Sequence, residues 1–259
     1  MARRITKSNL RPVLNYGNKE TCPICGGSGW EMYSAPAEIY GGKMAQFAKK
    51  CSKCGGKRDE DVSGIPFSEC DITRFNFKAY SVSIDGIKKI ALSLVDNFEK
   101  WQNAGKGLYL WSKTPGSGKT FLASCIARSL MLKYGLQVKF ITCPDYLNHV
   151  GDSYKRERGE RDKSEIFRSC QLLILDDLGS QISRDWQSQE LFRLINKRMS
   201  EGLITFYTSN MAPENLNLDD RTINRIVKSS ITIQMPEESI RLKKARDEQD
   251  KFLQDIIGI

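Results

Sequence analysis

Histidine is almost absent from the sequence, with His149 as its one occurrence in 259 residues. This scarcity excludes a site built on several imidazoles, so a structural metal site would have to consist mostly of thiolates. Long apolar runs are also missing, since even Leu172–Leu175 covers only a few residues and no segment can span a bilayer. The N-terminus lacks the apolar stretch of a signal peptide. We therefore expect a cytoplasmic protein without a membrane partner, in which the eight cysteines stay reduced.

The charge is unbalanced, with 40 Lys and Arg against 31 Asp and Glu, which gives a formal net charge of +9. This excess indicates a polyanionic or acidic partner, although it can also serve solubility alone. A hydrophobic content of 40% excludes wholesale disorder. The length fits one large domain or two smaller ones.

The chain divides by composition into three parts. Residues 1–65 are rich in Gly and Lys and poor in Leu, Ile and Val, and they contain two tight pairs of cysteines. Residues 66–83 are predicted to form a connector. From residue 84 to residue 259 the pattern changes to alternating helices and strands, which predicts a second domain.

The cysteine pairs of the first part predict a zinc site. Cys22 and Cys25 are followed by Gly-Gly, and so are Cys51 and Cys54, with 25 residues between the two pairs. Each CxxC turn can direct two thiolates at one ion, and the glycines permit the tight backbone that this requires. Binding of Zn²⁺ would also stabilise a segment with too little apolar surface to fold alone. A pair of redox-active CxxC motifs is the alternative.

The pattern over residues 84–259 predicts a largely parallel α/β sheet. Its strands read as continuous apolar runs rather than alternating ones, which is typical of strands covered by helices on both faces. The predicted strands are 107–111, 138–142, 172–176, 203–209 and 231–235. The predicted helices include one from Ile84 to Trp101, one from 118 to 134 that Gly135 closes, and one over 186–199.

A phosphate-binding loop lies between the first of these strands and the following helix. The sequence Thr114-Pro-Gly-Ser-Gly-Lys-Thr120 stands in the strand–loop–helix setting that such a loop requires, and we call it the phosphate loop. Its backbone amides would cradle phosphates, Lys119 would reach the β- and γ-phosphates, and Thr120 would coordinate Mg²⁺. The usual pattern has glycine at the position of Lys113, and this departure predicts a cost if that backbone position needs a positive φ.

Acidic and amide side chains follow two later strands. Asp176 and Asp177 end an apolar strand, where Asp176 is the candidate magnesium ligand and Asp177 the candidate base. Asn210 ends the next strand and can orient water or contact the γ-phosphate, or it can simply begin the turn toward Pro213.

Taken together, these motifs resemble those of the AAA+ ATPases of the DnaC/DnaI/IstB group. The resemblance covers residues 80–245 and rests on the phosphate loop with its flanking residues, on Leu172-Leu-Ile-Leu-Asp-Asp-Leu-Gly179 and on Thr208-Ser-Asn-Met-Ala-Pro-Glu214. It implies a P-loop AAA+ sheet with helices on both faces, preceded by the zinc-binding domain, which in DnaI-type loaders contacts the replicative helicase. The implied nucleotide contacts are Lys113, Thr114, Pro115, Gly116, Ser117, Gly118, Lys119, Thr120, Phe121 and Asp176.

The resemblance also gives roles to two arginines. Arg225, in a segment similar to the family's R-x-x-x-R helix, corresponds to the finger that acts on a neighbouring subunit's ATP, with Arg221 as the alternative. Arg241 corresponds to the arginine of the family's S-Y-R sensor, although Ile240 replaces the aromatic residue. A finger that acts in trans implies self-association on ATP or helicase binding. Both arginines can also be ordinary surface residues.

A basic stretch over 154–163 is the candidate contact for single-stranded DNA. Basic grooves with stacking aromatic residues bind single strands, and Tyr154, Lys155, Arg156 and Arg158 fit that description. Interleaved acidic residues are equally typical of a solvated helix face.

The sequence thus predicts an ATPase, with ATP, Mg²⁺ and Zn²⁺ as cofactors, that loads a replicative hexameric helicase onto single-stranded DNA. One alternative is an IstB-like ATPase that assists a transposase. The other is a nucleotide-independent adaptor with a degenerate phosphate loop.

Overall fold

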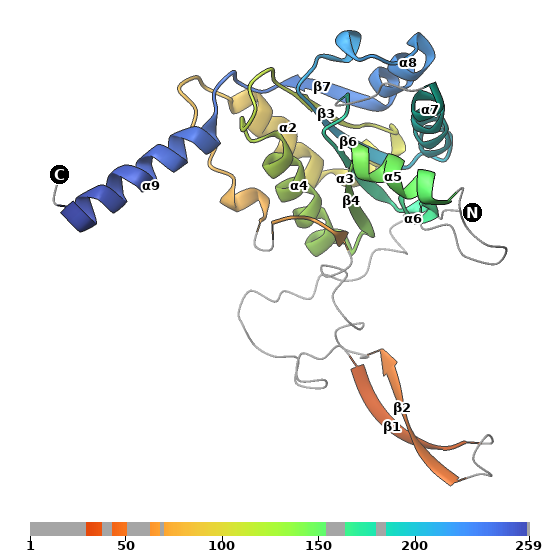
Figure 1. Cartoon of the computed structure of the whole chain (residues 1–259). Helices are drawn as coiled ribbons and strands as arrows, with labels where there is room; N and C mark the ends of the chain where they lie inside the picture. The colour runs from red at the N-terminus through yellow and green to blue at the C-terminus, as the bar shows by residue number, and fades with distance from the viewer. Residues whose placement is uncertain are drawn as a thin grey trace. The chain divides into compact units, whose positions relative to one another are not determined.

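The computed structural model describes residues 30–37, 43–50, 63–67, 70–153, 164–179 and 185–257. The chain forms two compact units that divide between Gly64 and Ile65. The smaller unit contains an antiparallel hairpin of β1 (Trp30–Ala37) and β2 (Lys43–Lys50), in which Trp30 pairs with Lys50 (Figure 1).

The larger unit is built on a five-stranded sheet in the order β4-β5-β6-β3-β7, and all neighbouring strands are parallel. This confirms the predicted parallel α/β sheet. The strands are β3 (Gly107–Trp111), β4 (Val138–Thr142), β5 (Leu172–Asp176), β6 (Ile204–Ser209) and β7 (Ser230–Gln234). Each begins and ends within one residue of its predicted bounds. The middle strands β5, β6 and β3 are buried nearly throughout, because helices cover both of their faces.

The sheet separates two apolar cores, and alternate residues of one strand enter different cores. Leu108 and Leu110 of β3 belong to one core, whereas Tyr109 between them belongs to the other. Residues of α2, α3 and α4 pack in the first core, and residues of α5, α7 and α8 pack in the second (Figure 1). The helices are α2 (Asp85–Asp96), α3 (Phe98–Asn103), α4 (Lys119–Tyr134), α5 (Cys143–Ser153), α6 (Glu165–Ser169), α7 (Asp185–Ser200), α8 (Asp220–Ser229) and α9 (Ile240–Ile257), with 3-10 turns at Ile72–Arg74 and Pro213–Asn215.

The helix predicted from Ile84 to Trp101 is wrong as a single element, because α2 and α3 meet at Asn97. Asn97 has φ −121° and ψ 36°, outside the helical region, and its N–H bonds to the carbonyl of Ser93. Asparagine is a weak helix former. The break lets Phe98 point into the core, where its ring lies 5.7 Å from that of Tyr134.

Residues 70–83, expected as part of a connector, contribute to the core of the larger unit. Cys70, Ile72, Phe75 and Tyr80 are buried there. The backbone N–H of Ile72 also donates to the hydroxyl of Ser129 on α4 (2.9 Å). This segment therefore holds the helix that follows the phosphate loop.

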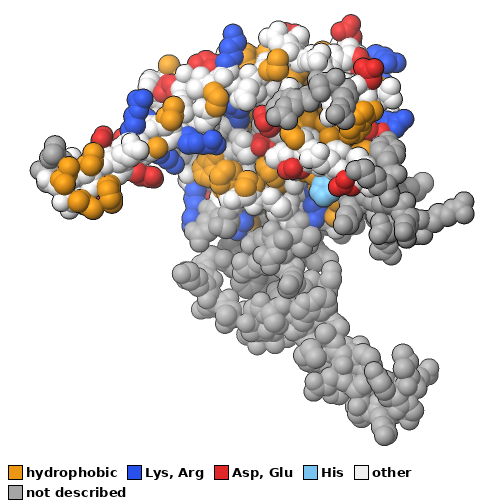
Figure 2. All heavy atoms as spheres, in the orientation of Figure 1, with side chains coloured by type: hydrophobic (Ala, Val, Ile, Leu, Met, Phe, Trp, Pro, Cys, Tyr) orange, Lys and Arg blue, Asp and Glu red, His pale blue; other side chains and the backbone are white. Residues whose placement is uncertain are grey.

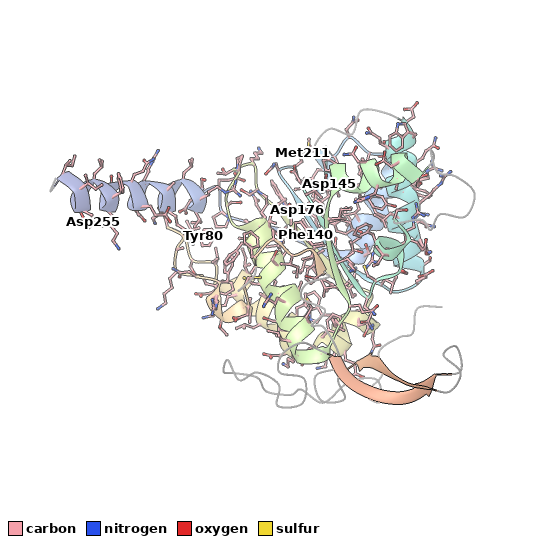
Figure 3. All side chains as sticks on the ribbon, turned by 60° about the horizontal axis from the view of Figure 1, so that its bottom comes forward. Tyr80, Phe140, Asp145, Asp176, Met211 and Asp255 are labelled. Atoms are coloured by element: carbon pink, nitrogen blue, oxygen red, sulfur yellow. The ribbon has the colours of Figure 1, made fainter. Side chains whose placement is uncertain are left out.

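No described helix is both long and apolar enough to cross a membrane. The last helix, α9, extends away from the sheet, and none of its residues is buried (Figure 1). Asp255 on α9 stands clear of the sheet residues Phe140 and Asp176 (Figure 3).

Candidate nucleotide-binding site

The phosphate loop connects β3 to α4 and contains two glycines in the left-handed region. Gly116 has φ 78° and Gly118 has φ 93°. A Cβ on Gly118 would lie 2.5 Å from the hydroxyl oxygen of Tyr80, and that hydroxyl donates to the carbonyl of Ser117 (2.7 Å). Glycine is therefore required at Gly118 both by its φ and by the close approach of Tyr80.

Lys113 fits its position without backbone strain. Among the described residues, Asp177 is the one non-glycine residue with a positive φ, so Lys113 does not occupy the left-handed region. The cost expected at this departure from the usual loop pattern is therefore absent.

A carboxylate that sequence reasoning missed, that of Glu237, holds the beginning of the loop. It lies between β7 and α9 and accepts hydrogen bonds from the backbone N–H groups of Lys113 (3.0 Å) and Thr114 (2.8 Å). It also accepts from the hydroxyls of Thr114 (2.8 Å) and Ser112 (3.2 Å). Desolvation acts in the opposite direction, but these bonds keep the pKa of Glu237 below its usual range. No sequence motif could have shown a contact across 123 to 125 residues.

Lys119 is turned into the loop. Its ammonium group donates to the carbonyls of Ser112 and Thr114 and to the hydroxyl of Ser117, each at 3.3 Å. The residue is 8% exposed. Burial lowers the pKa of Lys119, while the nearby carboxylate of Glu237 opposes that shift. A buried cation surrounded by loop carbonyls is suited to bind an anion that enters the loop.

Thr120 and Asp176, the two residues predicted to hold Mg²⁺, lie side by side. The Thr120 hydroxyl donates to Asp176 Oδ1 (2.8 Å). The Thr208 hydroxyl, at the end of β6, donates to the same oxygen (2.6 Å). Burial raises the pKa of Asp176, although the hydrogen bonds from Thr208 and Thr120 act in the opposite direction. The sequence indicated Thr208 only as part of the Thr-Ser-Asn motif, without a role.

Thr208 also orients the second carboxylate. The backbone N–H of Asp177 donates to the Thr208 hydroxyl (3.0 Å), and Asp177 has φ 56°. Non-glycine residues in this region cost free energy and persist where the surroundings hold them. Asn210 Nδ2 lies 3.5 Å from Asp177 Oδ1. The structure thus brings Asp176, Asp177 and Asn210 together at the carboxyl ends of β5 and β6.

The two predicted arginines lie in different places. The backbone N–H of Arg241 donates to the carbonyl of Gly116 (3.2 Å), which puts the first turn of α9 against the phosphate loop of the same chain. Arg225 on α8 instead donates from Nε to Asn196 on α7 (2.7 Å) and lies 4.6 Å from the ring centre of Phe192. Arg221 lies over the same ring at 5.5 Å.

The ring of Phe121 faces the core rather than the loop. It lies edge-on to Phe67 with centroids 5.1 Å apart and stacks near Phe75 at 5.9 Å. Four further predicted positions, Tyr154, Lys155, Arg156 and Arg158, lie outside the described residues, as do Cys22, Cys25, Cys51 and Cys54. Within the described ranges, no cluster of three or more His, Cys, Asp or Glu side chains could hold a metal ion.

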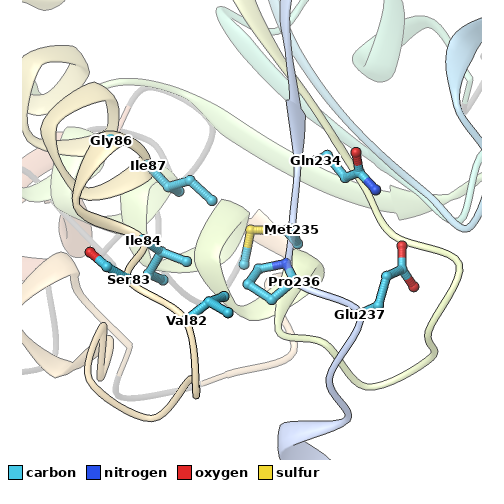
Figure 4. A pocket seen from close by; sticks show the side chains of 9 residues that line it. All are labelled: Val82, Ser83, Ile84, Gly86, Ile87, Gln234, Met235, Pro236 and Glu237. Atoms are coloured by element: carbon cyan, nitrogen blue, oxygen red, sulfur yellow. The ribbon is translucent and has the colours of Figure 1, made fainter.

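A pocket of about 360 Å³ adjoins the beginning of the loop. Val82, Ile84, Ile87, Met235 and Pro236 give it an apolar lining, shown in Figure 4. Glu237, which holds the loop, also lines the pocket.

The residues present fit Mg²⁺ and a nucleotide phosphate. Thr120 and Asp176 offer the hard oxygen donors that Mg²⁺ prefers. Asp176 is partly buried with a raised pKa, so a cation would stabilise its ionised form. Gly116 and Gly118 shape a loop at the N-terminus of α4, where backbone N–H groups and the helix dipole favour an anion.

Comparisons with known proteins agree with this geometry. A family model described as "IstB-like ATP binding protein" matches residues 71–248. The replicative helicase loader DnaI of Bacillus subtilis is 30% identical over 162 residues, which cover 61% of this chain and 47% of DnaI. The replicative helicase loader DnaC of Escherichia coli is 25% identical over 156 residues, which cover 58% of this chain and 62% of DnaC. The chain therefore spans about half to three fifths of these relatives.

Solved structures show the same fold. The crystal structure of the DnaC helicase loader has a TM-score of 0.58 at 22% identity and covers 64% of this chain and 97% of that one. The structure of AMPPCP-bound DnaA from Aquifex aeolicus has a TM-score of 0.54 at 17% identity, with 70% and 55% covered. The larger unit therefore has the P-loop AAA+ fold.

Proposed function

The chain belongs to the family of IstB-like ATP-binding proteins, and from this premise we propose that it is an ATPase that loads a replicative helicase onto single-stranded DNA. The observation that carries the ATPase proposal is the convergence of Lys119, Thr120, Asp176 and Asp177 around one loop. The similarity to replicative helicase loaders of two bacteria supports the choice of loader.

ATP would bind with its phosphates in the phosphate loop. The amides of the loop and Lys119 would hold the β- and γ-phosphates, in exchange for the carbonyl and hydroxyl contacts that Lys119 now makes. The pocket lined by Val82, Ile84 and Pro236 would take the base, since it is apolar and adjoins the loop through Glu237. The backbone contact of Arg241 with Gly116 supports a role for Arg241 at the phosphates of the same chain.

Hydrolysis would use the two carboxylates in different ways. Mg²⁺ held by Thr120 and Asp176 would offset the negative charge of the phosphates. Asp177, oriented by Thr208, would accept a proton from the attacking water, and Asn210 would help to orient that water. The raised pKa of Asp176 and the separate orientation of Asp177 support distinct roles for the two groups.

Arg225 would complete the site of a neighbouring subunit. The described contacts of Arg225 within its own chain are with α7 and with the Arg221 carbonyl. Helices α7 and α8 pack on the other face of the sheet from α4, the helix that follows the phosphate loop. An arginine placed there is available to a second copy that docks on this side. Self-association on ATP or helicase binding would follow from such a shared site.

The smaller unit would bind Zn²⁺ and the helicase. Its hairpin supports this, because pairing of Trp30 with Lys50 brings together the two ends of the segment that separates the cysteine pairs. Cys25 stands shortly before β1, and Cys51 directly follows β2. Tyr154, Lys155, Arg156 and Arg158 would contact the single-stranded DNA.

A loading assay tests the proposal. The full chain is incubated with ATP, the replicative helicase of the source organism and closed circular single-stranded DNA, and the helicase retained on the circles is counted. We expect loading that requires ATP, is lost in Lys119→Ala and persists in Lys89→Ala, an exposed lysine of α2. Failure to bind the helicase, together with capture of a transposase, would favour the transposition alternative. Full loading by Lys119→Ala would favour the nucleotide-independent adaptor.

A further inference from the structure

Helix α9 has an apolar stripe that no described residue of its own chain buries. All of its 18 residues are at least partly exposed. The large apolar residues among them are 47% to 64% exposed, namely Leu242, Phe252, Leu253, Ile256 and Ile257. They recur with the three- and four-residue spacing of one helix face, from Leu242 in the first turn to Ile257 in the last. Figure 2 shows hydrophobic side chains exposed near the far end of α9. Most helical stability in proteins comes from burying such a face, and within the part of the chain that the structure describes this face of α9 has no packing partner.

The charges on α9 are arranged against the helix dipole. Its first seven residues carry four positive charges and no negative one: Arg241, Lys243, Lys244 and Arg246. The remaining residues carry four acidic side chains against one lysine: Asp247, Glu248, Asp250, Asp255 and Lys251. An isolated helix is stabilised by the opposite order, with acids near its start and bases near its end. This order therefore serves something other than the stability of α9 alone.

We propose that α9 pairs with α9 of a second copy of this chain, in antiparallel orientation. With Gln249 at the centre of the pair, Leu242 of each copy would face Ile256 of the other, and Ala245 would face Leu253, beside Phe252. The stripes of the two helices would thereby cover each other along their length.

Charge complementarity favours a second copy of α9 as the partner and favours the antiparallel orientation. In the antiparallel pair, the basic beginning of one helix lies along the acidic end of the other. On a helical wheel, Arg246 and Asp250 lie on one flank of the stripe, so Arg246 of each copy would approach Asp250 of its partner. A parallel pair would place basic residues against basic residues and acidic residues against acidic residues, and this repulsion is unfavourable.

The way α9 is attached leaves room for such a pair. Its beginning is fixed to the rest of the unit through the N–H of Arg241 on Gly116 and the ammonium of Lys243 on the carbonyl of Ala79 (3.4 Å). A helix of this length extends about 27 Å. An antiparallel pair thus keeps the two sheets at opposite ends. This pairing differs from the ATP-dependent association through Arg225 in that it needs no nucleotide.

Sedimentation equilibrium of the full chain without nucleotide tests the proposal. We expect a monomer–dimer equilibrium over concentrations up to about 200 µM, because one helix pair buries less area than most stable complexes. Phe252→Gln with Ile256→Gln should raise the dissociation constant by about tenfold or more. The matched control, Asp247→Asn with Lys251→Gln, changes the opposite face and should not. Circular dichroism checks that each variant stays folded and keeps its helix content.

Charge reversal tests the direction of the pair. Arg246→Asp alone should weaken association, because it places two acidic side chains together at both contacts between positions 246 and 250. Adding Asp250→Arg to the same chain should restore association in an antiparallel pair, whereas a parallel pair would keep like charges opposed. A chain that stays monomeric throughout the concentration range would overturn the proposal. So would equal dissociation constants for the wild type and the Phe252, Ile256 variant.

Discussion

Replacing Thr208 by valine removes the hydroxyl that joins the two carboxylates of the site. Valine has nearly the same shape, so the change leaves no cavity, and Thr208 is only 2% exposed. The lost contacts are the hydrogen bond to Asp176 Oδ1 at 2.6 Å and the one from the N–H of Asp177 at 3.0 Å. A hydrogen bond to a charged group contributes about 1.5–3 kcal/mol, and a buried N–H without a partner costs about 1–3 kcal/mol. We expect the free energy of unfolding to fall by about 2.5–6 kcal/mol in total.

Urea unfolding measured beside Thr208→Ser tests this magnitude. Serine keeps the hydroxyl and loses only a methyl group, which costs about 1 kcal/mol. Hydrolysis of ATP should fall strongly in the valine variant and little in the serine variant, because the φ of Asp177 at 56° depends on the bond to this hydroxyl. Equal losses of stability in the two variants would refute the role of the hydroxyl.

The same variant has a defined pH dependence. Burial raises the pKa of Asp176 above its ordinary value near 3.8, and the Thr208 hydrogen bond opposes that shift. The folded state therefore holds the proton of Asp176 more tightly than the unfolded state, and ionising Asp176 costs stability as the pH rises through the raised pKa. Loss of the hydrogen bond enlarges that cost. The difference in stability between wild type and Thr208→Val should thus be larger at neutral pH than at acidic pH, where Asp176 is protonated.

Three further changes have expected outcomes. Glu237→Gln should weaken ATP binding several-fold in a calorimetric titration. The reason is that a glutamine amide cannot accept hydrogen bonds from all the groups that now donate to the Glu237 carboxylate. The control Glu238→Gln, at the adjacent residue, should leave ATP binding unchanged. Because the pKa of Glu237 is lowered, the hold of this carboxylate on the loop is lost as the pH falls through that pKa. Arg198→Met should lower the free energy of unfolding by about 3–5 kcal/mol in urea, because this fully buried side chain satisfies several carbonyls. Gly118→Ala should abolish ATP binding in a filter assay, since its Cβ would lie 2.5 Å from the Tyr80 hydroxyl.

The sheet and the main part of the site could be predicted from sequence because their signals are local. Continuous apolar runs gave the strands, and the phosphate loop occupies a strand–loop–helix setting that few other structures share. Asp176 and Asn210 end neighbouring strands, and the parallel order β5-β6 brings such ends together.

The remaining features depend on contacts between distant parts of the chain. Glu237 reaches a loop more than 120 residues earlier, and nothing in its own neighbourhood distinguishes it from Glu238. Thr208 acts through a hydroxyl that in most buried strands would only satisfy the backbone. Residues 70–83 read as a connector because their apolar side chains are sparse and irregular, yet Phe75 and Tyr80 close one side of the phosphate loop.

Equilibrium binding of ATP to the full chain, measured with Mg²⁺ and with chelator, tests directly whether the phosphate loop is a nucleotide site. We expect binding that strengthens with Mg²⁺, and we expect Asp176→Asn to remove this dependence on Mg²⁺. Lys119→Ala should weaken binding by about tenfold or more, since Lys119 is the buried cation of the loop. A chain that binds no ATP, or a Lys119→Ala variant that binds ATP as tightly as the wild type, would show that the loop does not hold the nucleotide in this way.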